Sequence, residues 1–195
     1  MMKRTFDLLL IVLLLPVWLP VMILVAMVVL VSMGMPVFFS QERAGKGGRP
    51  FRLYKFRTMR LGEGTDAERL TRVGRILRLT SLDELPELWN VLKDDMALVG
   101  PRPLPVRYLE RYTVEQNRRH EVKPGITGLA QVNGRNTLDW DEKFRFDVLY
   151  VDSQSLWLDF KILLKTIGQV FRLSEINHSG EATMSEFNNV REKGM

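Results

Sequence analysis

Two adjacent carboxylates, Asp83 and Glu84, are the side chains of this sequence best suited to covalent chemistry. Ser81 precedes them and apolar residues follow, so the simplest interpretation is a capping box in which Ser81 and Glu84 close the start of a helix. That interpretation leaves Asp83 unexplained. At a helix start, the helix dipole and the unpaired N–H groups would lower the pKa of Asp83 and attract a phosphate. An Asp carboxylate is a known nucleophile toward phosphorus, so the pair indicates phosphoryl transfer.

Basic side chains near this pair in the sequence could hold a phosphate. Lys55 and Arg57 lie on an extended segment, Arg78 precedes the pair, and Arg102 stands between two prolines. Cations beside a transferring phosphate offset the charge that develops on its oxygens. A site that has only oxygen ligands and also holds phosphates favours Mg²⁺, with both carboxylates of the pair as the expected metal ligands.

The composition excludes several other chemistries. The 195 residues contain no Cys and two His, which removes disulfides, thiolate metal sites and cysteine nucleophiles. The 28 Lys and Arg outnumber the 23 Asp and Glu, and the net charge of +5 favours an anionic membrane surface and phosphate substrates. Because the basic residues are interleaved with acidic ones and no aromatic stacking platform accompanies them, nucleic-acid binding is not expected.

The first forty residues predict a membrane anchor. No charged residue occurs from Leu8 to Ser40, a stretch longer than the roughly 20 residues that cross a bilayer and longer than the apolar part of a signal peptide. Lys3 and Arg4 precede the stretch and several basic residues follow it, so the positive-inside rule draws both ends toward the cytoplasm. These observations leave open a single span and a re-entrant helix bent near Pro20.

The remainder of the chain predicts a small domain of helices and strands. Extended segments around the glycine-rich turn at 44–50 predict one β-hairpin. Helices are expected over residues 67–79, 81–92, 106–119 and 155–171. The last of these has its apolar residues in one arc, so it faces either the core or the membrane interface. The arginines of 67–79 face either solvent or phosphates, and residues 174–195 indicate a loosely ordered tail.

Four long motifs carry a resemblance to one enzyme family. They are Lys55-Phe56-Arg57-Thr58-Met59, the run from Ser81 to Lys93, Val99-Gly100-Pro101-Arg102-Pro103-Leu104 and the run from Lys123 to Arg135. In this order, and over nearly the whole chain, they resemble the bacterial sugar transferases, the monotopic phosphoglycosyl transferases. The chain is similar to the minimal catalytic unit. The segment 180–188 is also similar to the tail of the small members that transfer phospho-diacetylbacillosamine.

The resemblance implies a reaction and a place for it. A sugar 1-phosphate would pass from a UDP-sugar to a polyprenol phosphate, usually undecaprenyl phosphate, with release of UMP, as the first membrane step of glycoconjugate assembly. The reaction would take place at the cytoplasmic face of the bacterial inner membrane. In family terms, Asp83 attacks the β-phosphorus and the lipid phosphate displaces the aspartyl intermediate. Glu84 would be the acid–base or metal-assisting partner beside Mg²⁺.

The resemblance also implies further site residues and a topology. The expected substrate-binding and phosphate-binding residues are Lys55, Arg57, Arg78, Arg102, Pro103, Arg135, Asp147 and Asp159. The family's membrane helix is re-entrant and broken at a Ser-Pro pair, which corresponds here to Leu19-Pro20, without the serine hydroxyl. A mostly helical α+β fold is therefore expected, with a re-entrant membrane helix over 1–40, interfacial amphipathic helices, and a compact catalytic domain over 41–195 on the cytosolic face.

A non-catalytic, membrane-tethered module that binds a nucleotide or an anionic lipid is the main alternative. It accounts for the apolar stretch and the arginines, but it gives Asp83 no role. Release of UMP from a UDP-sugar, with Mg²⁺ and undecaprenyl phosphate present, separates the two hypotheses.

Overall fold

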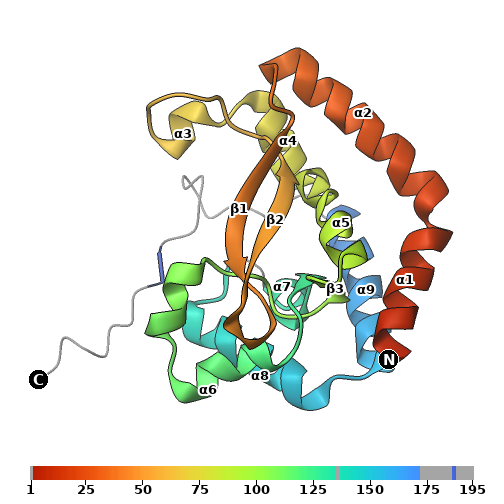
Figure 1. Cartoon of the computed structure of the whole chain (residues 1–195), viewed down its shortest axis with the longest axis vertical. Helices are drawn as coiled ribbons and strands as arrows, with labels where there is room; N and C mark the ends of the chain where they lie inside the picture. Colours follow the sequence, from red (N-terminus) through yellow and green to blue (C-terminus); the bar gives the residue numbers. More distant parts are fainter. Residues whose placement is uncertain (1, 135–136, 172–185, 188–195) are drawn as a thin grey trace, which may run out of the picture.

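The computed structural model of the chain describes residues 2–134, 137–171 and 186–187. Its first two helices, α1 (Met2–Leu13) and α2 (Leu15–Met33), form a bent arm along one side of a domain built from the other elements (Figure 1). The combination of many helices with two small sheets confirms the predicted, mostly helical α+β class.

The bend in the arm lies at Leu14, between the two helices. Pro16 lies in the first turn of α2, where its missing N–H costs little, while its ring prevents an unbroken helix from continuing out of the preceding turn. Pro20 lies inside α2. The structure therefore corrects the predicted position of the break, which is at Leu14 and not at Leu19-Pro20.

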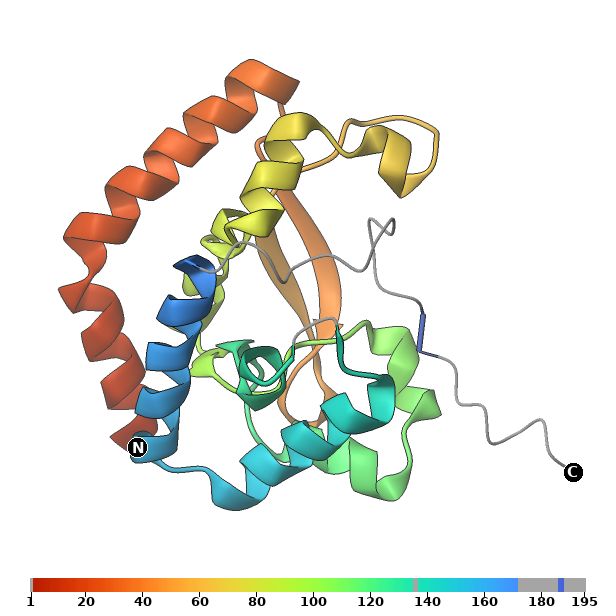
Figure 2. The same ribbon diagram turned by 180° about the vertical axis from the view of Figure 1, so that it is seen from behind.

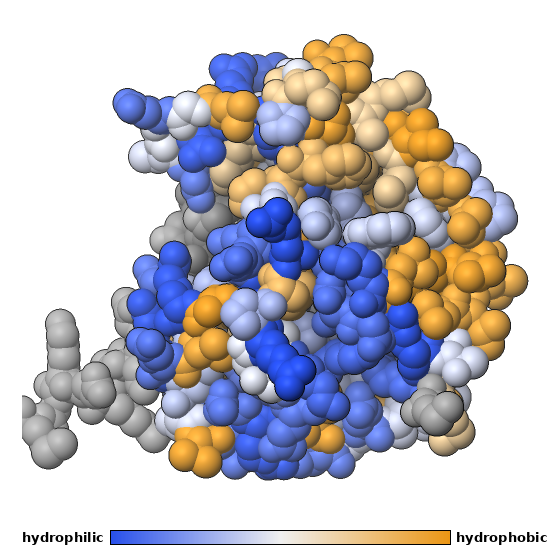
Figure 3. All heavy atoms as spheres, in the orientation of Figure 1, coloured by the Kyte–Doolittle hydropathy of each residue, from blue (hydrophilic) through white to orange (hydrophobic). Residues whose placement is uncertain are grey.

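The outward side of the arm is apolar. Val25 and Val29 pack against the domain, and α2 is long and apolar enough to cross a membrane, by length and composition. Exposed apolar residues of the arm include Leu9, Val12, Leu13, Val17, Ile23, Leu24, Met27 and Val31. Figure 3 shows this edge as hydrophobic beside a largely hydrophilic domain surface. An extended apolar surface of this kind marks a lipid or protein contact.

The predicted hairpin is confirmed. β1 (Phe38–Ala44) and β2 (Pro50–Phe56) pair antiparallel, and the turn between them contains the short 3-10 helix η1 (Lys46–Gly48). A second sheet, which the sequence did not predict, pairs β3 (Ala97–Val99) and β4 (Gly125–Thr127) in parallel. Each of these strands has only three residues, too few for a pattern of alternating apolar residues to be recognised.

Three predicted helices are divided in the structure. The elements that replace them are α3 (Asp66–Arg69) and α4 (Arg72–Leu79), then η2 (Leu82–Glu84) and α5 (Glu87–Leu92), then η3 (Val106–Arg111), α6 (Val114–Asn117) and η4 (Arg118–Glu121). The first division occurs because Leu70 is extended and forms a β-bridge with Met59, after which Thr71 caps α4. The second falls at Pro86, whose nitrogen cannot donate a helical hydrogen bond.

The remaining helices enclose the second sheet. They are α7 (Leu129–Val132), α8 (Trp140–Ser153) and α9 (Leu156–Phe171). Figure 2, which views the molecule from the opposite side to Figure 1, shows α8 and α9. Tyr150 of α8 and Ile162 of α9 are buried together with Val99 of β3. On the other side of the domain, Phe56 and Leu77 form a core with the inner face of α2. The hairpin and α4 are thus held between the arm and the rest of the domain.

Helix α9 confirms the helix predicted over 155–171, and most of its apolar arc faces outward. The arc residues Leu156, Phe160, Leu164 and Ile167 are exposed. Trp157, outside the arc, is exposed too, whereas Ile162 is buried. An exposed apolar face on a helix that also carries lysines favours the membrane-interface alternative over the core-facing one.

The predicted tail, residues 174–195, lies outside the described residues except for Glu186 and Phe187. Phe187 is buried among Tyr108, Tyr112 and Phe144, with ring centroids 4.9 to 5.7 Å apart. Such aromatic contacts hold this point of the tail against the domain.

Candidate active site

Asp83 and Glu84 lie in the short helix η2, and the capping box predicted for them is not formed. Ser81 has a left-handed backbone (φ 57°, ψ 17°) and its side chain caps nothing. The left-handed turn separates α4 from η2 and makes Ser81 a turn residue. Asp83 is buried, with 8% of its surface exposed. The carboxylate pair is therefore held by a tight turn and not by the start of a long helix.

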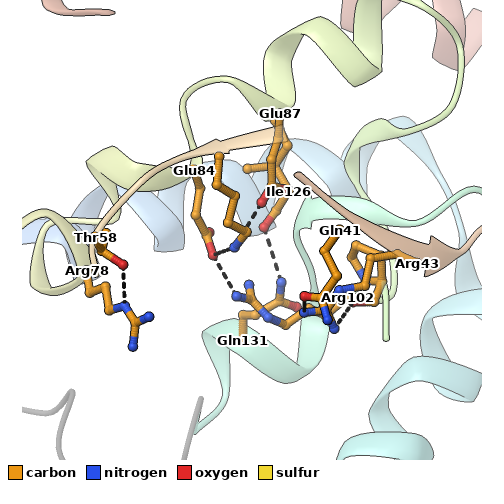
Figure 4. Close-up of polar contacts among 11 residues, drawn as sticks. Gln41, Arg43, Thr58, Arg78, Glu84, Glu87, Arg102, Ile126 and Gln131 are labelled. Atoms are coloured by element: carbon orange, nitrogen blue, oxygen red, sulfur yellow. Dashed lines mark hydrogen bonds and ion pairs between the residues drawn. The ribbon is translucent and has the colours of Figure 1, made fainter. Parts of the chain in front are cut away.

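Glu84 is paired with two cations from different parts of the chain. Its Oε1 atom lies 2.7 Å from Nζ of Lys55 on β2 and 2.6 Å from Nη2 of Arg102, in the loop after β3. Figure 4 shows Glu84 and Arg102 directed toward each other. Burial opposes ionisation, but Arg102 and Lys55 together hold the pKa of Glu84 well below its usual value. Glu84 is thus an ionised acceptor at neutral pH.

Asp83 has a different environment from its neighbour. Burial, and then the charge of Glu84, raise the pKa of Asp83 to about 6, against the lowering expected from a helix dipole. Asp83 is still largely ionised at pH 7. Its carboxylate has no hydrogen-bond or ion-pair partner among the residues that the structure describes. A buried, ionised and unpaired carboxylate is the form that a nucleophile requires.

Arg78 approaches the pair from α4. Its Nε donates to Oγ1 of Thr58 at 3.1 Å, a contact drawn in Figure 4, and its charge lowers the pKa of Asp83. The contact depends on Gly74, because a Cβ atom there would lie 1.9 Å from the Thr58 carbonyl oxygen. Three of the predicted phosphate-binding cations, Lys55, Arg78 and Arg102, are therefore brought together around Asp83 and Glu84.

Glu87 is a member of this cluster that the sequence did not identify. It begins α5, its side chain is 3% exposed, and its Oε1 atom lies 3.0 Å from Nζ of Lys55. Burial raises the pKa of Glu87 to about 7. Its position three residues after Glu84 could have identified it, because that spacing places both side chains on one face of a helical turn.

Arg57 binds the end of the arm and, among the residues that the structure describes, forms no hydrogen bond or ion pair with the carboxylate cluster. It is 5% exposed, and its Nη2 donates to the carbonyl oxygens of Met33 and Gly34, each at 2.6 Å. These carbonyls lie at the end of α2, where Gly34 adopts a positive φ of 72° that favours glycine. The structure thus places one guanidinium nitrogen of Arg57 on the end of α2, and phosphate binding by Arg57 stays a prediction.

Asp147 and Asp159 also form their ion pairs with residues outside the carboxylate cluster. Asp147, on α8, pairs with Arg119 at 2.7 Å, and both side chains are at most 4% exposed. Asp159, on α9, is fully buried, pairs with Lys3 and accepts a hydrogen bond from the Tyr150 hydroxyl at 2.6 Å. The structure thus places both carboxylates in ion pairs within the fold, with Arg119 and Lys3, and their role as substrate-binding groups stays a prediction.

Pro103, another predicted site residue, lies in the loop after β3. Pro103 is buried beside Arg102, and its carbonyl oxygen accepts from Nη1 of Arg43 at 3.4 Å. Arg119 supports the same turn, because its Nη2 donates to the Arg102 carbonyl oxygen at 2.7 Å. Arg43 and Arg119 therefore both hold the turn that carries Arg102 in place. Arg135 lies outside the described residues.

A metal ion at Asp83 and Glu84 would need ligands from the substrate. Within residues 2–134, 137–171 and 186–187, no group of three or more His, Asp or Glu is arranged to hold a metal. Mg²⁺ commonly takes one or two carboxylates together with water and substrate phosphates. The unpaired oxygens of Asp83 fit such a shared site, with Glu84 as its neighbour.

Similarity to known proteins identifies the family of this chain. Residues 1–173 match the family model described as bacterial sugar transferase. The uncharacterized sugar transferase EpsL of Bacillus subtilis is 50% identical over 192 residues, covering 95% of each chain. The UDP-glucose:undecaprenyl-phosphate glucose-1-phosphate transferase of Caulobacter vibrioides is 41% identical over 85% of this chain and 68% of that protein.

Other relatives are longer than this chain. The undecaprenyl-phosphate galactose phosphotransferase of Salmonella typhimurium is 40% identical over 88% of this chain, which spans 40% of that protein. The matched region includes the cluster of carboxylates and cations described above. The chain therefore belongs to the bacterial sugar transferase family and is a phosphoglycosyl transferase.

Proposed function

We propose that this enzyme transfers a sugar 1-phosphate from a UDP-sugar to undecaprenyl phosphate through a covalent intermediate on Asp83. The observation that carries the proposal is the buried, unpaired carboxylate of Asp83 beside the Lys55, Glu84 and Arg102 cluster. The names of the relatives supply the substrate classes, a UDP-sugar and undecaprenyl phosphate. The step would begin the assembly of a bacterial glycoconjugate.

The transfer takes place in two displacements. An oxygen of Asp83 attacks the β-phosphorus of the donor, the bond from that phosphorus to the oxygen bridging the two phosphates breaks, and UMP leaves. An oxygen of undecaprenyl phosphate then attacks the same phosphorus, and the carboxylate of Asp83 is released. The product is undecaprenyl diphosphate sugar. Each step exchanges one phosphorus–oxygen bond for another, so the two together conserve atoms and charge.

The surrounding side chains have separate tasks. Arg102, whose side chain is 45% exposed, and Arg78 offset negative charge on the phosphate oxygens. Lys55 and Glu84 hold each other in place next to the nucleophile. Mg²⁺ bound by Asp83 and Glu84, together with the donor diphosphate, would neutralise the negative charge of the phosphates.

We further propose that the arm is a re-entrant anchor at the cytoplasmic face of the bacterial inner membrane. Lys3 and Arg4, at the start of α1, bind Asp159 and the carbonyls at the end of α5. Arg57 binds the last carbonyls of α2. Because both ends of the apolar arm are tied to one domain, both ends lie on one side of the membrane. The exposed apolar face of α9 would lie in the same interface.

The topology predicts a labelling result. The chain has no cysteine, so Met2→Cys and Lys46→Cys each introduce a single thiol, at positions that are both exposed. We expect a membrane-impermeant maleimide to label both variants in inside-out vesicles and neither in right-side-out vesicles. Labelling of the two variants from opposite sides would establish a single span and contradict the re-entrant arm.

The reaction itself is tested by UMP release. We expect purified enzyme with Mg²⁺ and undecaprenyl phosphate to release UMP from at least one member of a broad UDP-sugar panel. Absence of UMP across the panel, with binding of nucleotide or anionic lipid retained, would favour the non-catalytic tethered module.

A further inference from the structure

Glu87 lies in the active-site cluster, but neither displacement uses it. The Lys55 ammonium lies 2.7 Å from Oε1 of Glu84 and 3.0 Å from Oε1 of Glu87. The Glu87 side chain is 3% exposed, compared with 15% for Glu84. Lys55 is thus held between two carboxylates, of which Glu87 is the deeper. Figure 4 shows Glu84 and Glu87 on the same side of the cluster, with Arg102 across from them.

Glu84 shares one carboxylate oxygen between two cations. Its Oε1 atom already accepts from both Lys55 and Arg102. If the same carboxylate turns toward a metal ion or a proton, the 2.7 Å contact with Lys55 is lost or weakened. A buried ammonium left without a carboxylate is costly, and it moves or loses its proton. A second carboxylate that takes no other partner prevents this.

Glu87 meets that requirement. Burial alone would lower the pKa of Lys55, yet Glu84 and Glu87 together raise it. Of the two carboxyl groups that accept from Lys55, Glu87 is the one farther from solvent. Lys55 therefore keeps a hydrogen-bond acceptor on Glu87 when Glu84 changes its own partners.

We propose that Glu87 is a positioning residue that holds the Lys55 ammonium beside Asp83 while Glu84 exchanges partners during transfer. Glu87 touches neither the substrate nor the reacting atoms in this proposal, and it acts only through Lys55. The proposal rests on the proposed function for its catalytic consequence, but the contact itself is independent of that function.

The catalytic consequence is tested by a double-mutant cycle. We expect Glu87→Ala to lower kcat/KM for UMP release about 10- to 100-fold, as is usual when a residue that orients a catalytic group is removed. In a Lys55→Ala background the same change is expected to matter less than about twofold, because its target is absent. Glu87→Gln keeps an oxygen that accepts from Lys55 and is expected to recover most of the activity. Glu63→Gln, at an exposed glutamate outside the cluster, is the matched control.

Chemical labelling of Lys55 tests the contact without turnover. Loss of Glu87 lowers the pKa of Lys55, and each unit of lowering makes the reactive amine about tenfold more abundant. We expect acetylation of Lys55, followed by peptide mass spectrometry, to be faster in Glu87→Ala than in the unchanged enzyme, with unchanged rates at Lys93 and Lys143. If no UDP-sugar releases UMP while Lys55 labelling changes as expected, the proposed function fails and the positioning role stands.

Three results would overturn the positioning role. They are unchanged Lys55 labelling in Glu87→Ala, an equal loss of activity with and without Lys55, and a Glu87→Gln variant as inactive as Glu87→Ala. Thermal unfolding of each variant separates these outcomes from a general loss of structure.

Discussion

The Asp83→Asn variant is expected to lose transfer activity by at least about a thousandfold, as is typical when a covalent nucleophile is removed. The amide has nearly the same shape as the carboxylate but cannot displace UMP. Because Asp83 is buried and repelled by Glu84, a neutral side chain at this position is easier to accommodate. The free energy of unfolding should therefore stay the same or increase. UMP release and thermal unfolding, measured on the same preparation, check both parts.

A matched control separates the nucleophile from charge loss in general. Asp66 is an exposed carboxylate in the first turn of α3, away from the cluster. Asp66→Asn should keep transfer activity close to that of the unchanged enzyme. Robust activity in Asp83→Asn, with the same metal and donor, would contradict a covalent route through this side chain.

The Asp147→Ala variant is expected to lose about 3–5 kcal/mol of folding free energy, the usual cost of leaving a buried charge without its partner. The charge concerned is that of Arg119, which is 3% exposed and also supports the Arg102 turn. Chemical denaturation in detergent or nanodiscs would give the change in free energy. The same experiment decides between a structural role and the substrate-binding role predicted from the sequence.

Asp152 provides the comparison for that measurement. It forms an ion pair with Arg118 in which both side chains are at least 33% exposed. Asp152→Ala should therefore cost no more than about 1 kcal/mol. If Asp147→Ala unfolds like the unchanged enzyme but has a raised KM for the donor, Asp147 binds substrate and its assignment as a structural partner is wrong.

The sequence predicted the elements whose patterns are long and local. The hairpin was indicated by alternation around a glycine-rich turn, and α9 by its amphipathic period. The helix predicted over 67–79 is divided, because a contact between Leu70 and Met59 overrides local helix preference. Such a contact joins distant parts of the chain and leaves no local pattern. The parallel strands β3 and β4 have three residues each, too few for a local pattern to predict them.

The sequence indicated which types of residue form the site, but not which individual residues of those types lie in it. An arginine has the same donors whether it binds a phosphate or the end of a helix, so Arg57 could not be told apart from Arg78 or Arg102. The sequence likewise does not show that Asp147 pairs with Arg119 and Asp159 with Lys3. Glu87 joined the cluster only through Lys55, which lies on a strand 32 positions earlier in the chain.

Mass spectrometry of the enzyme mixed with its donor alone tests the covalent intermediate most directly. Without undecaprenyl phosphate, the peptide that contains Asp83 should gain the mass of one phosphosugar, and adding the lipid phosphate should remove it. An unmodified peptide, under conditions in which the complete mixture forms product normally, would show that the sugar phosphate passes from donor to lipid without stopping on the protein.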